Sequence, residues 1–273
     1  MKGVARTALL HGVLGGAAVV TLLPLLWMVS ASFMPTGEAT ALPPRLFPSA
    51  VTFEHYRVLF TRLSLARYAV NSALLAVSVT LISLLLNSMA GYAFAKFRFG
   101  GRDRIFQTLL AALVIPGQVA MLPLFLMLKE MGVINTYWGV IIPGMASVFG
   151  IFLMRQYALS IPDTLLDAAR IDGAGEFRIY WSLVLPTSMP ILVTLAIFTF
   201  MGTWNDFLWP LIVLTDDRMY TLPVALANLA GEHVQDIELM MAGAVLTVLP
   251  VVVVFVALQR YYIAGILSGS IKE

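Results

Sequence analysis

The sequence contains no cysteine and little charge. Asp, Glu, Lys and Arg make up 12% of its 273 residues, whereas 60% of the residues are hydrophobic. Soluble domains carry about 25% charged residues and about 45–50% apolar ones. The absence of cysteine excludes a disulfide framework and a thiolate metal site. The shortage of charge predicts that lipid, rather than water, surrounds most of the chain.

Motifs for catalysis and nucleic-acid binding are also missing. The three histidines are scattered and show no HExxH spacing, so we expect no metal site. The sequence has no GxxxxGKS or GxxxxGKT loop, which excludes ATP hydrolysis by a P-loop of its own. The apolar stretches hold no nucleophile–base pair and no paired carboxylates, which argues against a membrane-embedded enzyme. The net charge is +2, and the basic residues flank apolar stretches instead of forming a stripe, which argues against a nucleic-acid surface.

Six stretches are long and apolar enough to cross a bilayer, which takes about 20 residues of helix. The first exceeds the apolar core of about 7–15 residues in a signal peptide, so we expect a retained anchor. The sequence therefore predicts an all-α membrane protein with a single transmembrane domain over 1–273. The predicted spans lie at about 8–33, 68–95, 105–128, 138–157, 188–214 and 239–260.

Lys and Arg are concentrated in the segments that face the cytoplasm if the N-terminus lies inside. This orientation places eleven of the 17 basic residues in cytoplasmic segments and six outside. The clearest contrast is between residues 96–104, which are strongly basic, and residues 215–238, which are acidic. Because Lys and Arg favour cytoplasmic loops, both termini are predicted to be cytoplasmic. The Pro-rich segment 34–67 is then external, and its amphipathic second half predicts a short surface helix.

The second long connection, residues 158–187, lies between the fourth and fifth predicted spans. Its pattern predicts two short helices at the inner membrane surface. Gly173 is placed to end the first helix in a left-handed conformation. The apolar face of the second helix is expected to consist of Phe177, Tyr180, Trp181 and Val184. On this pattern alone, the segment is equally well explained as an ordinary amphipathic connector.

The spacing within this connection resembles the signature of bacterial ABC importer permeases. That signature is Glu-Ala-Ala, three residues, Gly, nine residues, Ile, one residue, Leu-Pro. Here Asp167-Ala168-Ala169 is followed at the same intervals by Gly173, Leu183 and Leu185-Pro186. Asp167 and Leu183 are conservative departures from the family's Glu and Ile. The match includes glycine and proline, whose conformational preferences set the geometry of the turn.

The resemblance extends along nearly the whole chain and is to the second, smaller permease subunit of maltose-type sugar importers. It implies a type I ABC importer permease fold in the bacterial inner membrane. In that family the loop between the fourth and fifth spans forms a coupling helix that docks into a cleft of the ATPase. The further matching residues are Pro24, Trp27, Thr52-Phe53-Glu54-His55-Tyr56, Asn71-Ser72, Trp204-Asn205, Trp209-Pro210, Thr221-Leu222-Pro223, Ile263-Ala264-Gly265 and Gly269.

The resemblance assigns ATPase coupling to residues 158–187, the coupling loop, and to the C-terminal tail. Paired alanines beside a glycine turn suit a close approach to a partner. The charged residues among them, Asp167, Arg170 and Asp172, either form ion pairs with the ATPase or stay solvated at the edge of the interface. The matching positions are Asp167, Ala168, Ala169, Arg170, Asp172, Gly173, Leu183, Leu185, Pro186, Ser268, Gly269 and Ile271.

The implied function is import of a sugar or oligosaccharide. The implied partners are a second permease subunit, two ATP-binding-cassette ATPase subunits and an external solute-binding protein. No cofactor is expected on this chain, whereas ATP and magnesium are expected on the partner ATPase. A non-sugar solute such as glycerol phosphate is the alternative substrate class. An ATP-independent channel or carrier is disfavoured, because carriers commonly show mid-membrane ionisable groups and internal repeats.

Polar side chains at membrane depth are the candidates for a substrate path, because such groups usually face a cavity or a partner. The amide of Asn205 can bond to sugar hydroxyls, and the ring of Trp204 can stack on a pyranose. Asp206 either lines a cavity or meets water at the outer interface, where tryptophans gather. Gln118 and Asn71 are further candidates, although amides in membrane bundles also form interhelical hydrogen bonds.

The cysteine-free sequence allows the predicted topology to be tested with single cysteines. Gly101→Cys lies in the basic segment predicted inside, and Asp217→Cys lies in the acidic segment predicted outside. A membrane-impermeant thiol reagent applied to intact cells should therefore label only Asp217→Cys. Gly101→Cys should react after the membrane is disrupted. Labelling of Gly101→Cys from outside would contradict the topology.

Overall fold

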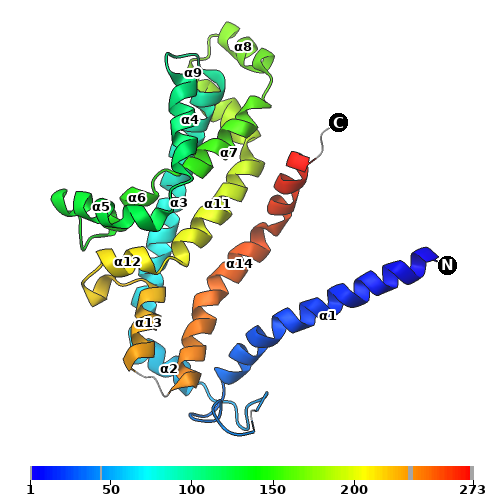
Figure 1. Ribbon diagram of the computed structural model, residues 1–273, viewed down its shortest axis with the longest axis vertical. Helices are drawn as coiled ribbons and strands as arrows, with labels where there is room; N and C mark the ends of the chain where they lie inside the picture. Colours follow the sequence, from blue (N-terminus) through cyan, green and yellow to red (C-terminus); the bar gives the residue numbers. More distant parts are fainter. Residues whose placement is uncertain (1, 44, 233–235, 271–273) are drawn as a thin grey trace. The chain divides into compact units, whose positions relative to one another are not determined.

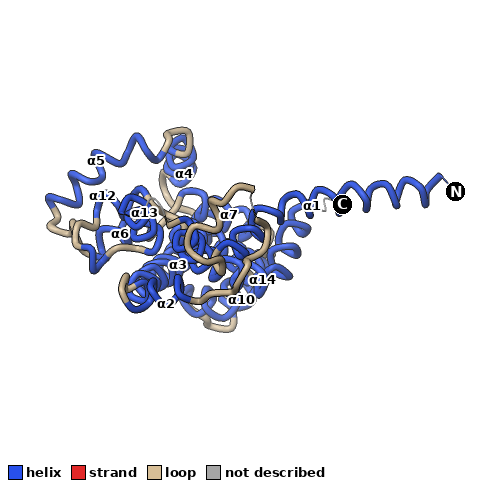
Figure 2. The backbone as a smooth tube through the Cα atoms, turned by 90° about the horizontal axis from the view of Figure 1, so that it is seen from below, coloured by secondary structure: helices blue, strands red, loops and turns tan. Residues whose placement is uncertain are grey.

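Every described element of the computed structural model is a helix or a connecting loop (Figures 1 and 2). The structure describes residues 2–43, 45–232 and 236–270, and within them no strand occurs. The prediction of an all-α protein is therefore confirmed. The chain divides into two compact units: Met1–Arg67 with Leu222–Pro250, and Tyr68–Thr221 with Val251–Glu273.

Most helices follow one another with short connections, but residues 32–53 separate α1 from α2. A π-helical turn over Tyr180–Val184 joins α9 to α10, and a 3-10 turn over Asp217–Met219 precedes α13. The bounds are α1 Lys2–Ala31, α2 Glu54–Thr61, α3 Leu65–Lys96, α4 Arg102–Ala112, α5 Gly117–Glu130, α6 Tyr137–Gly144, α7 Val148–Leu159, α8 Asp163–Ile171, α9 Glu176–Ile179, α10 Leu185–Thr187, α11 Met189–Trp204, α12 Leu208–Val213, α13 Leu222–Glu232 and α14 Ile237–Ser270.

Several helices are long and apolar enough to cross a membrane. In the described part of the chain there are four such segments, or up to six if each of two bent helix pairs counts as one span. The four segments are Leu9–Ala31, Leu65–Lys96, Tyr137–Leu159 and Ile237–Gln259. They coincide with four of the six predicted spans.

The stretch predicted as one span at 105–128 is divided between α4 and α5. The two helices meet at 106°, and Pro116 lies directly before α5. Proline has no N–H to donate and disfavours the α conformation in the residue before it, which ends α4. A second bend, of 78°, separates Glu176–Thr187 from α11. Pro190 lies in the first turn of α11, where proline is tolerated.

In the first unit, residues 34–67 contain the short helix expected there, α2. Its buried residues are His55 and Leu59, and His55 Nε2 lies 2.8 Å from the Met34 carbonyl oxygen. The Glu38 carboxylate accepts hydrogen bonds from the Arg45 guanidinium and from the backbone of Ser49. These contacts fold the Pro-rich part of the segment back on itself.

In the second unit, α3 packs tightly against α7. The Asn87 amide donates to Ser83 and accepts a 3.0 Å hydrogen bond from the backbone of Ser147, the N-cap of α7. One turn further along α3, Gly91 has no room for a side chain. A Cβ there would lie 2.7 Å from the Met154 Cβ and 2.8 Å from the Arg155 nitrogen. Both atoms belong to α7, so the two helices approach at backbone distance.

Gly91→Ala should destabilise the protein, because the added methyl group meets backbone atoms that cannot rotate away. Overpacking of this kind costs about 1–3 kcal/mol. Gly202→Ala in α11 is the matched control, because a Cβ there meets no other atom within 4 Å in the described structure. Thermal unfolding of both purified variants in detergent measures the difference. An unfolding temperature unchanged in Gly91→Ala would contradict the close packing of α3 on α7.

Candidate functional site

The coupling loop folds as α8, a glycine turn and α9. Pro162 precedes α8, and its fixed φ suits the start of a helix. Gly173 has a φ of 81°, the left-handed conformation predicted from the sequence. Its N–H bonds to the Arg170 carbonyl, and the N–H of Ala174 bonds to the Ala169 carbonyl. This pair of hydrogen bonds is the Schellman motif, which satisfies carbonyls at the end of α8.

One arginine joins the two helices of the loop. The Arg170 guanidinium donates to Asp167 on α8 at 2.7 Å and to Glu176 on α9 at 2.8 Å. Its hydrogen bonds to Glu176 and then to Asp167 raise the pKa of Arg170 above its ordinary value. Asp167 and Arg170, two positions of the signature, therefore form ion pairs within the loop itself.

Polar side chains at the end of α3 hold the loop in place. The Lys96 ammonium donates to the Ile161 carbonyl at 2.6 Å and to the Asp163 carboxylate at 2.7 Å. The hydrogen bond and charge of Lys96 lower the pKa of Asp163 below its ordinary value. The Tyr92 hydroxyl donates to Glu176 at 3.1 Å. These contacts fix both helices of the loop to the same end of α3.

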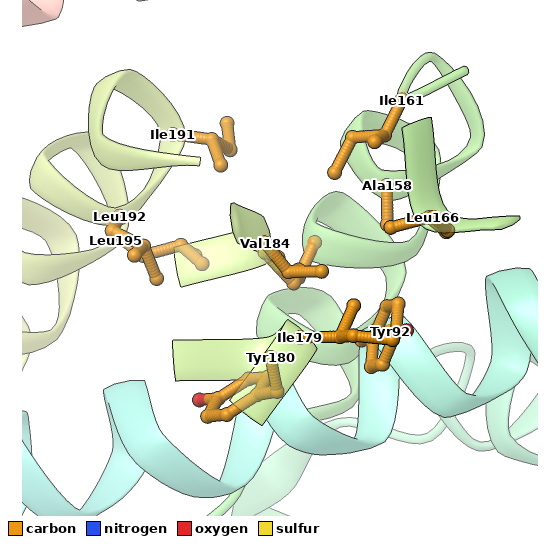
Figure 3. Packing of buried hydrophobic residues seen from close by; sticks show 11 residues of the cluster. Tyr92, Ala158, Ile161, Leu166, Ile179, Tyr180, Val184, Ile191, Leu192 and Leu195 are labelled. Atoms are coloured by element: carbon orange, nitrogen blue, oxygen red, sulfur yellow. The ribbon is translucent and has the colours of Figure 1, made fainter. Parts of the chain in front are cut away.

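An apolar cluster lies beneath the loop (Figure 3). Ile179, Tyr180 and Val184 from the second half of the loop are buried in it, and Leu166 on α8 is 1% exposed. The Tyr180 hydroxyl lies 2.6 Å from the Ser88 hydroxyl of α3. The remaining labelled members are Tyr92, Ala158, Ile161, Ile191, Leu192 and Leu195.

The predicted apolar face of the second loop helix is only half right. Tyr180 and Val184 are buried, but the side chains of Phe177 and Trp181 are 70% and 51% exposed. The prediction assumed 3.6 residues per turn, whereas the chain forms a π-helical turn over Tyr180–Val184. The wider turn rotates the following residues, so that Val184 comes back to the side of Ile179.

The structure separates the two alanines of the signature. Ala169 is half-buried and packs against the cluster beneath the loop, whereas Ala168 is exposed. Leu165 is 40% exposed and Ile171 is 87% exposed. Leu165, Ala168 and Ile171 therefore form an outward apolar stripe on α8, with Asp172 exposed beside it.

The other signature positions are divided between the cluster and the surface. Leu183 and Leu185 pack against the cluster, and Pro186 is exposed. Of the tail positions, Ser268 and Gly269 fall in the last turns of α14, and Ile271 lies outside the described residues. The structure thus assigns the leucines an internal packing position.

A cavity of about 340 Å³ lies among α3, α5, α6, α11 and α12, and shares no lining residue with the loop cluster. Gln118 and Asp206, both predicted for a substrate path, line it together although they are distant in sequence. Thr203 and Trp209 also line it and were not predicted as path residues. The indole N–H of Trp209 donates to the Gly139 carbonyl at 3.0 Å, which fixes one wall. The walls are otherwise mainly apolar, with Val79, Met121, Leu124 and Val140 among them.

The remaining path candidates are placed elsewhere. The Asn205 amide is exposed and donates to the Met201 carbonyl of its own helix, and Trp204 is buried and stacks on Phe200. Asn71 is buried. Its amide donates to the carbonyls of Arg218 and Tyr220 and accepts from the Tyr137 hydroxyl. Because these bonds occupy its donors and its carbonyl, they favour a structural role for Asn71.

An all-helical chain with four to six segments able to cross a membrane defines a polytopic membrane protein. Residues 87–267 match the family described as the inner membrane component of binding-protein-dependent transport systems. The chain therefore belongs to this family, whose members are permease subunits of ABC importers in the inner membrane and not enzymes. The matched range includes the coupling loop and every residue that lines the cavity except Val79.

Similar proteins serve carbohydrate transport. The chain is 39% identical to an arabinooligosaccharides transport system permease protein of Halalkalibacterium halodurans, over 93% of this chain and 92% of the relative. It is 34% identical to a diacetylchitobiose uptake system permease protein of Streptomyces coelicolor, over 97% and 89%. A crystal structure of a bacterial ABC transporter involved in import of the acidic polysaccharide alginate contains a similar chain. It has a TM-score of 0.83 at 26% identity and covers 95% of this chain and 96% of that one.

Proposed function

We propose that this chain is the transmembrane permease of an ABC importer that moves a sugar or oligosaccharide into the cytoplasm. Membership of the transport family supports the importer. The carbohydrate named for both relatives, and for the transporter of similar structure, supports the substrate class. The proposed complex contains a second permease subunit, two ATPase subunits that hold ATP and magnesium, and an external solute-binding protein.

The outward apolar stripe on α8 is the observation that carries this proposal. Ile171, at the end of the stripe, is 87% exposed between the charged residues Arg170 and Asp172. An isolated cytoplasmic loop gains nothing from exposing such a large apolar side chain. A stripe of one small and two larger apolar side chains suits a docked partner. The loop is also fixed to α3 by Lys96 and Tyr92, so a displacement of α8 is transmitted to the membrane helices. Rigid-body rocking of packed helices is the motion that alternating access requires.

The proposed topology has six spans, with both termini in the cytoplasm. Three lie in the single helices α1, α3 and α14, α6 with α7 supplies a fourth, and the bent pair of α4 and α5 supplies a fifth. The sixth contains α11, the second helix of the other bent pair. A bend within a span is compatible with lipid when neighbouring protein covers the broken backbone. The basic segment 96–104 and the coupling loop then lie on the same, cytoplasmic side, which agrees with the Lys96–Asp163 ion pair between them.

The proposed substrate path passes the cavity lined by Gln118 and Asp206. An amide and a carboxylate can accept and donate hydrogen bonds to sugar hydroxyls, and the apolar walls suit the faces of a sugar ring. An ionised Asp206 would repel a phosphate group. The carboxylate therefore favours a neutral sugar over glycerol phosphate. If the chain were an ATP-independent channel, no ATPase would cover the exposed apolar stripe on α8.

Ala168→Trp should detach or uncouple the ATPase, because Ala168 lies in the middle of the stripe. Ala168→Ser keeps the size of the side chain and is the matched control. Gly173→Val should have a similar effect by another cause, since a Cβ in the left-handed conformation costs about 1–2 kcal/mol and unseats α8. The measurements are ATPase retention on the purified complex and substrate-stimulated hydrolysis. An ordinary interfacial connector predicts wild-type retention for Ala168→Trp, and that result would contradict the coupling proposal.

Gln118→Ala and Asp206→Asn should each lower uptake, by about fivefold for the loss of one hydrogen bond to substrate. Uptake is measured with an oligosaccharide that the wild-type complex transports, alongside the amount of assembled complex. Asn205→Ala is the comparison variant, because its amide already bonds to Met201 of its own helix. Impaired uptake in Asn205→Ala alone, with assembly intact, would move the path from the cavity to the Trp204–Asn205 pair.

A further inference from the structure

The turn between α3 and α4 and the start of α4 form an open basic cavity of about 450 Å³ at the surface. Its walls contain three arginines and a single carboxylate: Arg98, Arg102, Arg104 and Asp103. Phe99 and Gly101 complete the lining. Arg102 pairs with Asp103 at 2.9 Å, so the one carboxylate of the cavity is already neutralised. Neither the proposed path nor the coupling surface uses this cavity.

Arg98 and Arg104 contribute the remaining positive charge. Within the part of the chain that the structure describes, neither side chain forms a hydrogen bond or an ion pair, and both residues are exposed. The nearby carboxylate of Asp163, whose pKa the charge of Arg98 helps to lower, is bound by the Lys96 ammonium. The two guanidinium groups are therefore available to an anion from outside the chain.

The walls of the cavity are supported by packing. Arg102 Nη1 donates to the Phe97 carbonyl at 3.2 Å, which holds its guanidinium against the turn. The ring of Phe99 packs on Phe94, with the ring centroids 5.8 Å apart. Phe94 in turn packs on Phe106 of α4, at 5.5 Å. These contacts connect both ends of the turn, so the arginines project from a supported backbone and not from a long loop.

The position of the cavity favours a ligand at the membrane surface. The turn is only residues 97–101, between the end of one candidate span and the start of the next. It lies on the cytoplasmic side if the proposed topology holds. The Phe99 side chain, 43% exposed, is an aromatic group of the kind that gathers at membrane interfaces. A ligand in this cavity meets guanidinium groups and an apolar ring together.

We propose that this cavity binds a phosphate group, supplied by the headgroup of an anionic phospholipid of the cytoplasmic leaflet. Guanidinium groups bind phosphate oxygens in a planar, bidentate arrangement. Clusters of basic residues directly beside a membrane helix attract anionic lipids. The exposed ring of Phe99 lies against the glycerol or acyl part of the lipid. A soluble phosphate compound shares the phosphate chemistry but gains nothing from that ring.

Arg98→Gln and Arg104→Gln should each weaken retention of phosphatidylglycerol by about fivefold. The measurement is native mass spectrometry of the purified complex from nanodiscs that contain phosphatidylglycerol and phosphatidylcholine. Arg62→Gln, an exposed arginine in the external segment, removes the same charge away from the cavity and should leave retention unchanged. Arg98→Lys and Arg104→Lys keep the charge but lose the bidentate geometry, and should bind more weakly than the wild type. Equal retention in the wild type, the Gln variants and the Lys variants would overturn the proposal.

A second arm identifies the source of the phosphate. Inorganic phosphate is titrated into the complex in phosphatidylcholine nanodiscs and followed by phosphorus NMR. Binding of the lipid but not of free phosphate supports the headgroup. If free phosphate binds, and Arg104→Gln weakens its binding as much as it weakens retention of phosphatidylglycerol, the lipid proposal is wrong. The ligand is then a soluble phosphate compound. If the Gln variants keep phosphatidylglycerol but lose the ATPase, the arginines contact an acidic protein surface and the proposal is wrong.

Discussion

Helix α3 holds the coupling loop through contacts that would be costly to break. The Lys96 ammonium is nearly buried, and the Ile161 carbonyl and the Asp163 carboxylate satisfy it. The Tyr180 and Ser88 hydroxyls bond to each other in a buried setting, where an unpaired hydroxyl is unfavourable. Since α3 also meets α7 at backbone distance through Gly91, the loop is packed on a pair of helices that are themselves in close contact. These contacts are the ones through which the proposed coupling would act.

Interruptions of helices coincide with the cavity. It is lined by Gly117 and Gln118 at the start of α5, by Pro143 and Gly144 at the end of α6, and by residues on both sides of the break between α11 and α12. Broken helices leave backbone groups that must be satisfied by protein or water, and in membranes they are tolerated where they line a cavity. The same prolines and glycines that break the helical pattern thus also create the space that a solute can occupy.

The sequence alone was sufficient for properties that depend on local pattern. Low charge and long apolar stretches indicated lipid as the solvent. The all-α fold followed, because a helix satisfies the backbone hydrogen bonds of each long apolar stretch within that stretch. Gly173 was placed correctly in the left-handed conformation, since no other residue type adopts it so readily. The intervals from Asp167 to Pro186 indicated the transport family, because they fix the lengths of two helices and the turn between them.

Tertiary packing decided which side chains face inward. Ala168 and Ala169 are equivalent in sequence, but only Ala169 packs against the loop cluster, because the contacts of Leu166 set the rotation of α8. Trp181 was misplaced because a π-helical turn changes the period, and its single extra residue leaves little mark on the pattern. Gln118, at the start of α5 after the 106° bend, and Asp206, after α11, line the same cavity although they are distant in sequence. The positions of these side chains depend on contacts between residues that are distant in sequence, and local periodicity does not predict such contacts.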